Sequence, residues 1–397
     1  MSLKNNFHPQ TQILKTPAAP AGFAAQMPAV THASTILFPN MATFAARHTG
    51  DGADYIYGTH GTPIIKQLEA MMAQNDGGLG ATILPSGLAA VTVVTLSLVK
   101  AGEHVLIPDN VYGGNMEAFM SFFPRMGITH TVYDPMDLAA LPALFQANTK
   151  LVWAETPGFV TFEVPDVAAI AAIAHKHHAL LALDNTWSAG VNFKAFEHHV
   201  DVSAQAMTKY QCGHSDVLMG SVVWQDAALG KAILATQHAL GICVSPDDAY
   251  LVIRGMQTMH LRLREQGKNS IELATWLGQQ DAVQSASVLH PALPSCPGHA
   301  TYLRDFKGAG CVFSFYLAEK YTIEDAYRFV DALQLFGIGA SWAGTHSLAL
   351  HMPVNARVNP QRLPKGQLIR LSIGLEHIED LRADLAQAFA AMSAAIS

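Results

Sequence analysis

Short apolar segments alternate with helical ones between Ala81 and Trp224, and this alternation limits the fold more than any other feature of the chain. The segment Ala81–Leu84 has the pattern of a strand, and Leu88–Val99 after it has the pattern of a helix. Strands that are separated by helices pair in parallel, with helices on both faces of the sheet. We therefore predict an α/β fold built on a mostly parallel sheet. The same pattern predicts strands over Val105–Pro108, Ile128–Tyr133 and Lys150–Glu155, and helices over Asn115–Phe123 and Val167–His178.

The pattern changes near residues 245–250, which indicates a second domain. At 397 residues, the chain is long for one compact core. We predict an extended N-terminal arm over residues 1–58, a large domain over 59–247 and a smaller C-terminal α/β domain over 248–397. The C-terminal domain is predicted to contain helices over Ala249–Leu277 (kinked at Gly255 or Gly267), Ile323–Phe336 and Ile378–Ile396, and strands over Cys311–Leu317 and Leu368–Ile373.

The arm is rich in proline and has no sustained period, so it is not expected to form part of a core. Such a segment is either a disordered tail or an extension that docks on another surface. The apolar residues Ile36, Leu37 and Phe38 favour docking.

Composition excludes several classes of partner. Half of the residues are apolar and 14% are charged, which suits a large core and charge-poor subunit interfaces. The net charge of −7 provides no basic surface for nucleic acid. The 4 cysteines form no paired motif and predict free thiols in a reducing compartment. No apolar run reaches the length of a membrane span, and no leader peptide is evident. We expect a cytoplasmic oligomer with no nucleic-acid or membrane partner.

Two predicted strands deliver functional side chains to their carboxyl ends. Asp184 ends the apolar run Ala179–Leu183, and Lys209 ends the run that begins at Asp201. In open α/β sheets, ligands collect outside the carboxyl ends of the strands. A buried lysine readily lowers its pKa and becomes a nucleophilic amine. By itself, a lysine at a strand end is more often a surface group whose stem packs on apolar neighbours.

The motifs around these residues strengthen the functional interpretation. Asp184-Asn-Thr-Trp187 and Thr208-Lys-Tyr-x-x-Gly-His-Ser-Asp216 are highly specific. With them, the chain resembles the fold-type I pyridoxal phosphate enzymes of cysteine and methionine metabolism, from about Tyr57 to Glu376. The resemblance implies an aminotransferase-like fold and pyridoxal 5′-phosphate as cofactor. It also implies that Lys209 bonds to the cofactor and that Asp184 holds the ring nitrogen protonated.

Further cofactor contacts follow from the resemblance. Ser86, Gly87 and Leu88 lie where a strand meets a helix, a position that either caps the helix or binds phosphate. The family's Ser-Gly-(Met/Leu)-Ala motif coincides with them, and Thr208 is implied as another phosphate contact. Tyr112 either packs in the core or, as the resemblance implies, stacks on the pyridine ring.

A buried arginine marks the expected substrate end of the site. Arg370 lies within an apolar strand, where an unpaired guanidinium is unfavourable. Its partner is either an internal carboxylate or the carboxylate of a substrate. The resemblance implies the second, with Ser341 and Trp342 lining the same end and the substrate a small amino acid.

The sequence also departs from the family at two positions that are expected to lie near the cofactor phosphate. Many relatives have Arg at the position of Thr59, and often Ser at the position of Ala206. Here His60 is the nearby candidate for positive charge. The resemblance further implies a homotetramer, a dimer of dimers, in which Tyr57 reaches the neighbouring subunit's phosphate and assists catalysis together with Tyr112.

The implied activity is β-cleavage of cystathionine to homocysteine, pyruvate and ammonia, with Lys209 as the base at Cα. Trp187 and Trp342 favour this over γ-chemistry, because γ-enzymes tend to have Phe after Asp-Asn-Thr. A γ-synthase or γ-lyase type enzyme and a non-catalytic cofactor-binding regulator are the alternatives. The pairs His177-His178 and His198-His199 lack acidic support and do not indicate a metal site.

Overall fold

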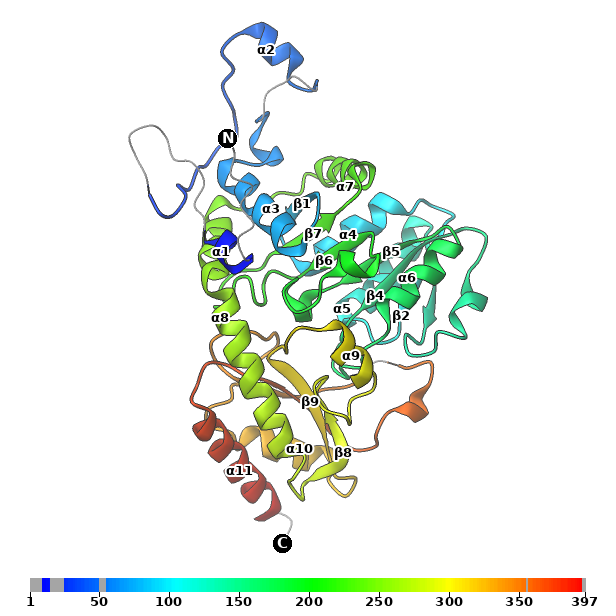
Figure 1. Ribbon diagram of the computed structural model, residues 1–397, viewed down its shortest axis with the longest axis vertical. Helices are drawn as coiled ribbons and strands as arrows, with labels where there is room; N and C mark the ends of the chain where they lie inside the picture. The colour runs from blue at the N-terminus through cyan, green and yellow to red at the C-terminus, as the bar shows by residue number, and fades with distance from the viewer. Residues whose placement is uncertain (1–8, 15–24, 50–54, 355, 395–397) are drawn as a thin grey trace.

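The structure is a computed structural model that describes residues 9–14, 25–49, 55–354 and 356–394. These residues contain a 7-stranded sheet and a 4-stranded sheet, which occupy the upper and lower halves of the molecule in Figure 1. The predicted α/β class, with a large domain and a smaller C-terminal domain, is confirmed. The strands of the large sheet are β1 (Gly80–Leu84), β2 (His104–Pro108), β3 (Thr129–Tyr133), β4 (Thr149–Glu155), β5 (Leu180–Asp184), β6 (Val202–Gln205) and β7 (Gly220–Trp224).

The large sheet has the strand order β1-β7-β6-β5-β4-β2-β3. The neighbours from β6 to β3 pair in parallel, as the alternation of strands and helices predicts. β7 instead runs antiparallel to both β1 and β6. The connection over residues 206–219 contains Lys209 but no helix, so it is a loop rather than a crossover unit.

Helices cover both faces of this sheet. Val105 and Ile107 of β2 pack in the same core cluster as α4, whereas Leu106 packs with α6 on the other face. Strands that are buried on both faces are apolar at nearly every position, as β2 is after His104. The helices are α3 (Pro63–Asp76), α4 (Gly87–Leu98), α5 (Gly113–Glu117), α6 (Val167–Lys176) and α7 (Ala227–Ala239). The helix predicted over Asn115–Phe123 instead changes at Ala118–Phe122 into a π-helical turn.

The long helix α8 (Pro246–Leu277) joins the two cores. Met256 and Met259 pack with the large domain, whereas Leu273 and Leu277 pack with the small one. The helix is uninterrupted from Pro246 to Leu277, and a kink at Gly255 or Gly267 stays a prediction. The two glycines permit close approach: a Cβ on Gly255 would lie 2.3 Å from the Cys212 carbonyl oxygen, and one on Gly267 would lie 2.4 Å from that of Ala309.

The C-terminal domain is an antiparallel sheet of order β10-β11-β9-β8, with helices packed on it. The predicted strands over residues 311–317 and 368–373 are confirmed, but β8 and β10 are additional strands. The predicted helix over Ile323–Phe336 ends early, at Asp331. The elements are β8 (Val283–Leu289), α9 (His299–Asp305), β9 (Val312–Leu317), α10 (Ile323–Asp331), β10 (Leu348–His351), β11 (Leu368–Ser372) and α11 (Ile378–Ala394).

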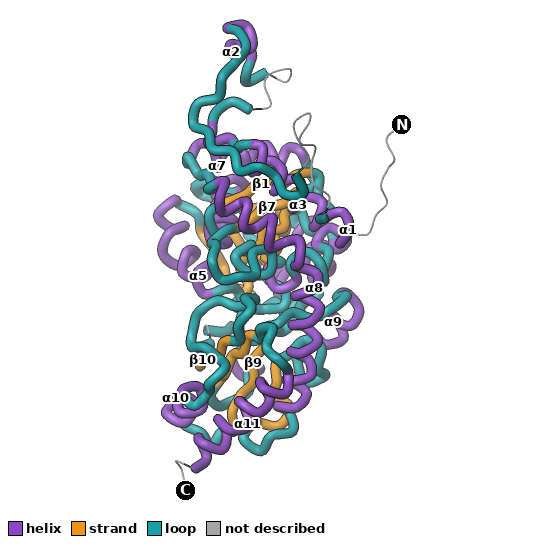
Figure 2. Tube along the Cα trace, turned by 90° about the vertical axis from the view of Figure 1, so that its left-hand side faces the viewer, coloured by secondary structure: helices purple, strands orange, loops and turns teal. Residues whose placement is uncertain are grey.

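The described parts of the arm include two short helices, α1 (Pro9–Ile13) and α2 (Met41–Ala46). Residues 1–8, 15–24 and 50–54 of the predicted arm lie outside the described residues. α1 contacts α3 and α8, whereas the segment that carries α2 extends away from the body of the molecule (Figures 1 and 2). In the described part of the chain, no helix is both long and apolar enough to cross a membrane.

Candidate active site

The candidate active site lies at the carboxyl edge of the large sheet, where the two domains meet. β4 and β5 end in Glu155 and Asp184, which are register partners in the parallel pair. Lys209 comes from the loop after β6, and Arg370 comes from β11 of the small domain. Asp184, Arg370 and Trp342 line one common cavity. The structure therefore brings together the predicted ring-binding, nucleophilic and carboxylate-binding residues.

Asp184 is held by the residue two positions after it. The Thr186 hydroxyl donates to Asp184 Oδ1 at 2.5 Å, and the Thr186 amide donates to the same oxygen at 3.0 Å. The Thr186 hydroxyl in turn accepts from the amide of Ala206, which fixes the start of the loop that carries Lys209. Burial raises the pKa of Asp184, and the Thr186 hydrogen bonds and Lys209 oppose this rise. A positively charged group next to Asp184 favours the ionised form of its carboxylate.

Lys209 does not end a strand, as the sequence pattern suggested, because β6 stops at Gln205. The lysine lies in the turn that follows, where its amide donates to the Ala206 carbonyl at 3.1 Å. Its Nζ donates to Ser341 Oγ at 2.6 Å and lies 5.3 Å from the centre of the Trp342 ring. Burial, and secondarily the charge of Arg370, lower the pKa of Lys209 to about 8. The side chain is therefore a buried nucleophile rather than a surface lysine.

Arg370 pairs with a backbone carbonyl rather than with an internal carboxylate. Its guanidinium donates to the Ser341 carbonyl oxygen at 3.1 Å, and the described residues form no ion pair with it. The side chain is buried, which lowers the pKa of Arg370 to about 10. Ser341 has a φ of 82°, a left-handed conformation that non-glycine residues rarely adopt. The strained Ser341 thus directs its hydroxyl to Lys209 and its carbonyl to Arg370.

Glu155 is a site residue that sequence reasoning missed. Its Oε2 accepts from the amide of Tyr112 at 2.7 Å, which anchors that residue at the start of α5. Burial, and then the neighbouring Asp184, raise the pKa of Glu155 well above its usual range. The signal was present in the sequence, because Glu155 ends a strand just as Asp184 does. The Tyr112 ring is half-exposed and meets Phe159 edge-on, with the ring centres 5.2 Å apart.

The predicted phosphate cradle forms a tightly packed turn at the start of α4. Ser86 caps the helix by accepting from the Ala89 amide at 3.0 Å. A Cβ on Gly87 would lie 2.6 Å from the Cβ of Ala206, so only glycine fits against the Lys209 loop. Leu88 lies in the first turn of the helix and is exposed.

The Thr208 side chain is held by the backbone of Met219. The Thr208 hydroxyl accepts from the Met219 amide at 2.9 Å and donates to the Met219 carbonyl at 3.1 Å. The Thr208 hydroxyl therefore donates its proton to the backbone just before β7. This hydrogen bond joins the two ends of the loop that contains Lys209. A phosphate contact of Thr208 stays a prediction.

His60 also differs from expectation. It packs against His238 with ring centres 4.2 Å apart, in a pocket that also contains Thr59 and Lys66. Burial, and then the charges of His48 and Lys66, lower the pKa of His60. Within one chain, His60 is thus a poor source of positive charge at neutral pH. Tyr57 is exposed next to it, and its contact with a neighbouring subunit stays a prediction.

The residues present fit pyridoxal phosphate. The cofactor needs an amine for its aldehyde carbon, an acid for its ring nitrogen and a helix start for its phosphate. Lys209, Asp184 and the Ser86–Leu88 turn provide these groups around one loop. A Cβ on Gly114 would lie 2.6 Å from the Tyr112 ring, so glycine leaves room for that ring beside the site.

Known proteins resemble this chain over most of its length. A Rhizobium johnstonii protein named putative cystathionine β-lyase is 45% identical over 92% of this chain and 92% of its own. A cystathionine β-lyase of Haemophilus influenzae is 39% identical, covering 91% of this chain and 92% of the relative. An L-alanine/L-glutamate racemase of Wolbachia pipientis is 37% identical over the same shares of the two chains, 91% and 92%.

Solved structures share the fold. A cystathionine γ-lyase from Lactobacillus plantarum, complexed with L-serine, has a TM-score of 0.88 at 30% identity and covers 98% of this chain and 100% of its own. A putative O-acetylhomoserine (thiol)-lyase from Campylobacter jejuni, which contains a pyridoxyl-lysine group, has a TM-score of 0.88 at 25% identity, covering 96% and 99%. Residues 10–390 match the family described as Cys/Met metabolism PLP-dependent enzyme. The chain belongs to this family of pyridoxal phosphate-dependent enzymes.

Proposed function

We propose that the protein is a carbon–sulfur β-lyase that cleaves cystathionine to homocysteine, pyruvate and ammonia. The observation that carries the proposal is the Lys209 amine, which has a pKa of about 8 and lies between Asp184 and the Ser341–Arg370 pair. The names of the relatives from Rhizobium johnstonii and Haemophilus influenzae support the β-cleavage specificity.

Each residue has a distinct part in the proposed mechanism. When bound, pyridoxal phosphate supplies an electron sink that stabilises negative charge at the substrate Cα. Arg370 binds the α-carboxylate through the guanidinium N–H groups that Ser341 leaves free. Lys209 removes the proton from Cα, since at pH 7 roughly a tenth of an amine of this pKa is neutral. Asp184 would hold a proton on the ring nitrogen, and Tyr112 would help to position the ring.

Both tryptophans line the cavity that contains Arg370 and Asp184. Trp342 packs edge-on against Tyr210, with ring centres 5.5 Å apart. Trp187 is buried, and its indole nitrogen donates to the Val312 carbonyl at 3.1 Å. Both are therefore candidates for shaping the substrate end. The fold does not separate β- from γ-chemistry, because the γ-lyase has a TM-score of 0.88 to this chain.

The products of one incubation test the proposal against its alternatives. Cystathionine is given to the purified holoenzyme, and the keto acids are separated and quantified. Pyruvate formed in equal amount with homocysteine supports β-cleavage, whereas 2-oxobutyrate indicates γ-cleavage. A parallel incubation with L-alanine, followed by chiral separation, tests the racemase activity named for the Wolbachia relative. If the protein binds the cofactor but forms no product from either substrate, the non-catalytic cofactor-binding regulator is supported instead.

We further propose the homotetramer, with Tyr57 directed to a neighbouring subunit's site. Its support is the exposure of large apolar side chains on the arm: Leu37 is 90% exposed and Met41 is 73% exposed. All 4 cysteines are free, as predicted. The cytoplasmic location stays a prediction.

A further inference from the structure

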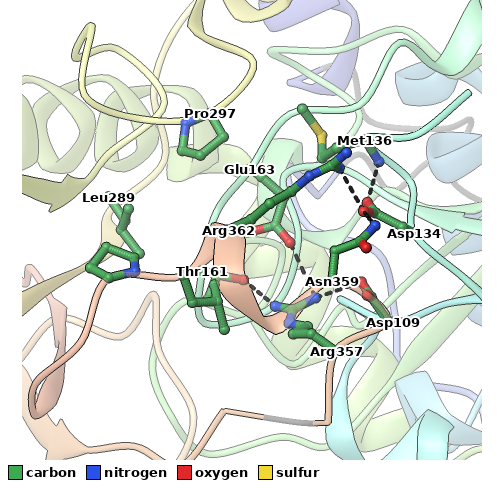
Figure 3. A pocket seen from close by; sticks show the side chains of 12 residues that line it. Asp109, Asp134, Met136, Thr161, Glu163, Leu289, Pro297, Arg357, Asn359 and Arg362 are labelled. Atoms are coloured by element: carbon green, nitrogen blue, oxygen red, sulfur yellow. Dashed lines mark hydrogen bonds and ion pairs between the residues drawn. The ribbon is translucent and has the colours of Figure 1, made fainter.

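A cavity of about 380 Å³ lies between the two domains and is lined by charged residues of both (Figure 3). From the large domain come Asp109 and Asp134, which directly follow β2 and β3. From the small domain come Arg357 and Arg362, which belong to a segment over residues 357–364 that we call the strap. The strap crosses the carboxyl edge of the large sheet at β2 and β3. Next to β2 in this sheet are β4, which ends in Glu155, and then β5, which ends in Asp184.

Arg357 is the buried centre of this contact. Its guanidinium lies 2.9 Å from Asp109 Oδ1 and 3.2 Å from Glu163 Oε1, and it also donates to the Thr161 hydroxyl. Figure 3 shows these partners converging on the guanidinium from the large domain. The side chain is 5% exposed. The Val358 amide donates to the second oxygen of Asp109 at 2.8 Å, so both oxygens of this carboxylate are held by the strap.

These partners belong to two loops that present aromatic rings to the candidate active site. Asp109 starts the loop that reaches Tyr112, and Thr161 and Glu163 follow Phe159. The two loops are also joined directly, because the Phe159 amide donates to the Asn110 carbonyl at 2.7 Å. The Tyr112 and Phe159 rings then meet edge-on at the site. Arg357 therefore ties the two loops together through Asp109, Thr161 and Glu163.

The second loop has a conformation that needs such support. Val160 has a φ of 70° and Phe162 has a φ of 55°, both in the left-handed region. This region is unfavourable for bulky residues and especially for a β-branched one. Backbone of this kind persists only where surrounding contacts hold it. Arg357 supplies them at Thr161, between the two strained residues, and at Glu163 just after them.

We propose that Arg357 is a positioning residue, which fixes the loops of Tyr112 and Phe159 so that the Tyr112 ring is oriented in advance for the cofactor. The role rests on the proposed function, since it assumes that the cofactor binds beside Tyr112. It does not depend on which substrate is cleaved.

The test compares Arg357→Ala with Arg362→Ala as a matched control. Arg362 belongs to the same strap, but it pairs with Asp134 and Asp137, outside the two loops. We measure the dissociation constant of pyridoxal phosphate from the apo-protein, the visible circular dichroism of the bound cofactor, and KM and kcat separately. In Arg357→Ala we expect about tenfold weaker cofactor binding and a diminished dichroism band, because loss of a buried charged hydrogen bond changes affinity by about this factor. In Arg362→Ala the dissociation constant of the cofactor and the intensity of the dichroism band should both stay within about twofold of wild type.

Two further variants keep the test decisive if Arg357→Ala does not fold. Arg357→Lys retains the charge but cannot join three partners, and Thr161→Val removes one hydrogen bond at almost constant volume. Both should weaken the dichroism band by less than Arg357→Ala, with the protein folded. The proposal is overturned if the folded Arg357 variants lose only thermal stability, or if Arg362→Ala changes cofactor binding equally. Cofactor binding needs no turnover, so a failed lyase assay leaves this test intact.

Discussion

At the scale of single residues, the site contains two neighbouring carboxyl groups whose pKa values are both raised by burial. Glu155 accepts from the Tyr112 amide, whereas Asp184 receives two hydrogen bonds from Thr186, and the Lys209 charge opposes the rise in its pKa. The charge of Asp184 raises the pKa of Glu155 further, because adjacent carboxylates in a buried site do not both ionise readily.

The state of Lys209 leads to a prediction about pH. A pKa of about 8 means that the fraction of neutral amine rises with pH up to about 8 and changes little above it. We expect the rate of cofactor capture by the apo-protein to follow the same curve. Rapid-mixing absorbance at several pH values measures it, with Lys209→Ala as the control that shows no covalent capture and no turnover. A rate that still rises tenfold per pH unit between 8 and 10 would contradict the lowered pKa.

Asp184→Asn should keep the fold but lose activity. The amide still accepts from Thr186 but cannot hold a proton on the ring nitrogen. We expect kcat to fall roughly 10²-fold or more, a barrier increase of about 3 kcal/mol. Steady-state kinetics with a far-ultraviolet dichroism control measures the effect. Near-normal turnover in a folded Asp184→Asn protein would mean that another group serves the ring nitrogen.

At the scale of elements, the start of α4 and the Lys209 loop form one unit. Ser86 caps the helix, Gly87 packs on Ala206, and Gly220 at the start of β7 packs on the Ser86 carbonyl. A Cβ on Gly220 would lie 2.2 Å from that oxygen. The helix amides that we expect to bind phosphate and the lysine that we expect to bind the ring are therefore set relative to each other by backbone contacts. Because the chain has Thr59 where many relatives have Arg, we expect this turn to carry much of the phosphate binding.

This packing predicts the effect of a single methyl group. Gly87→Ala places its Cβ 2.6 Å from the Cβ of Ala206, which forces the helix start away from the loop. We expect pyridoxal phosphate to bind about tenfold more weakly, as lost charge-assisted contacts of about 1.5 kcal/mol imply. Gly278→Ala, whose new Cβ meets its nearest atom at 3.5 Å, is the control. Equal cofactor affinity in wild type and Gly87→Ala would show that the turn does not hold the phosphate.

At the scale of the whole molecule, the two domains meet around the site. Lys209 and Asp184 come from the large domain, Ser341 and Arg370 from the small one, and the strap holds the domains together beside them. α8 belongs to both cores, so the domains share a rigid connection. Among the described residues of the arm, Ile13 of α1 and the partly buried Met27 and Val30 pack on the core of the large domain. The exposed apolar residues of the arm, such as Leu37 and Met41, are a candidate surface for another subunit.

The exposed arm predicts a change in assembly. Leu37→Asp places a charge where a subunit interface is expected, so association should weaken, while the folded chain loses little because Leu37 is 90% exposed. Sedimentation velocity over a concentration series measures the oligomer, and thermal unfolding measures the fold. Leu303→Asp, at a position that is 65% exposed on α9, is the control. An unchanged oligomer in Leu37→Asp would exclude this part of the arm from the interface.

The sequence by itself determined the features that depend on neighbours along the chain. Apolar periodicity placed the strands near β1 to β5 and the helices near α4 and α6, because one buried face repeats at a fixed spacing, but it did not predict α7. Asp184 was found because it ends such a strand. The Ser86 cap was found because caps act within one turn. Motif resemblance then identified the cofactor before any contact was known.

Only the tertiary structure decided the contacts between distant segments. Ser341 meets Lys209 across 132 residues, and Arg357 meets Asp109 across 248. The local pattern did not reveal β8 and β10, which pair antiparallel to β9 and β11, respectively. β6 ends before Lys209, and in the loop that follows the Met219 amide donates to the Thr208 hydroxyl. Such pairings carry no local period, since they depend on how two domains pack. The same holds for the pKa of Lys209, because burial and the charge of Arg370 exist only after the chain has folded.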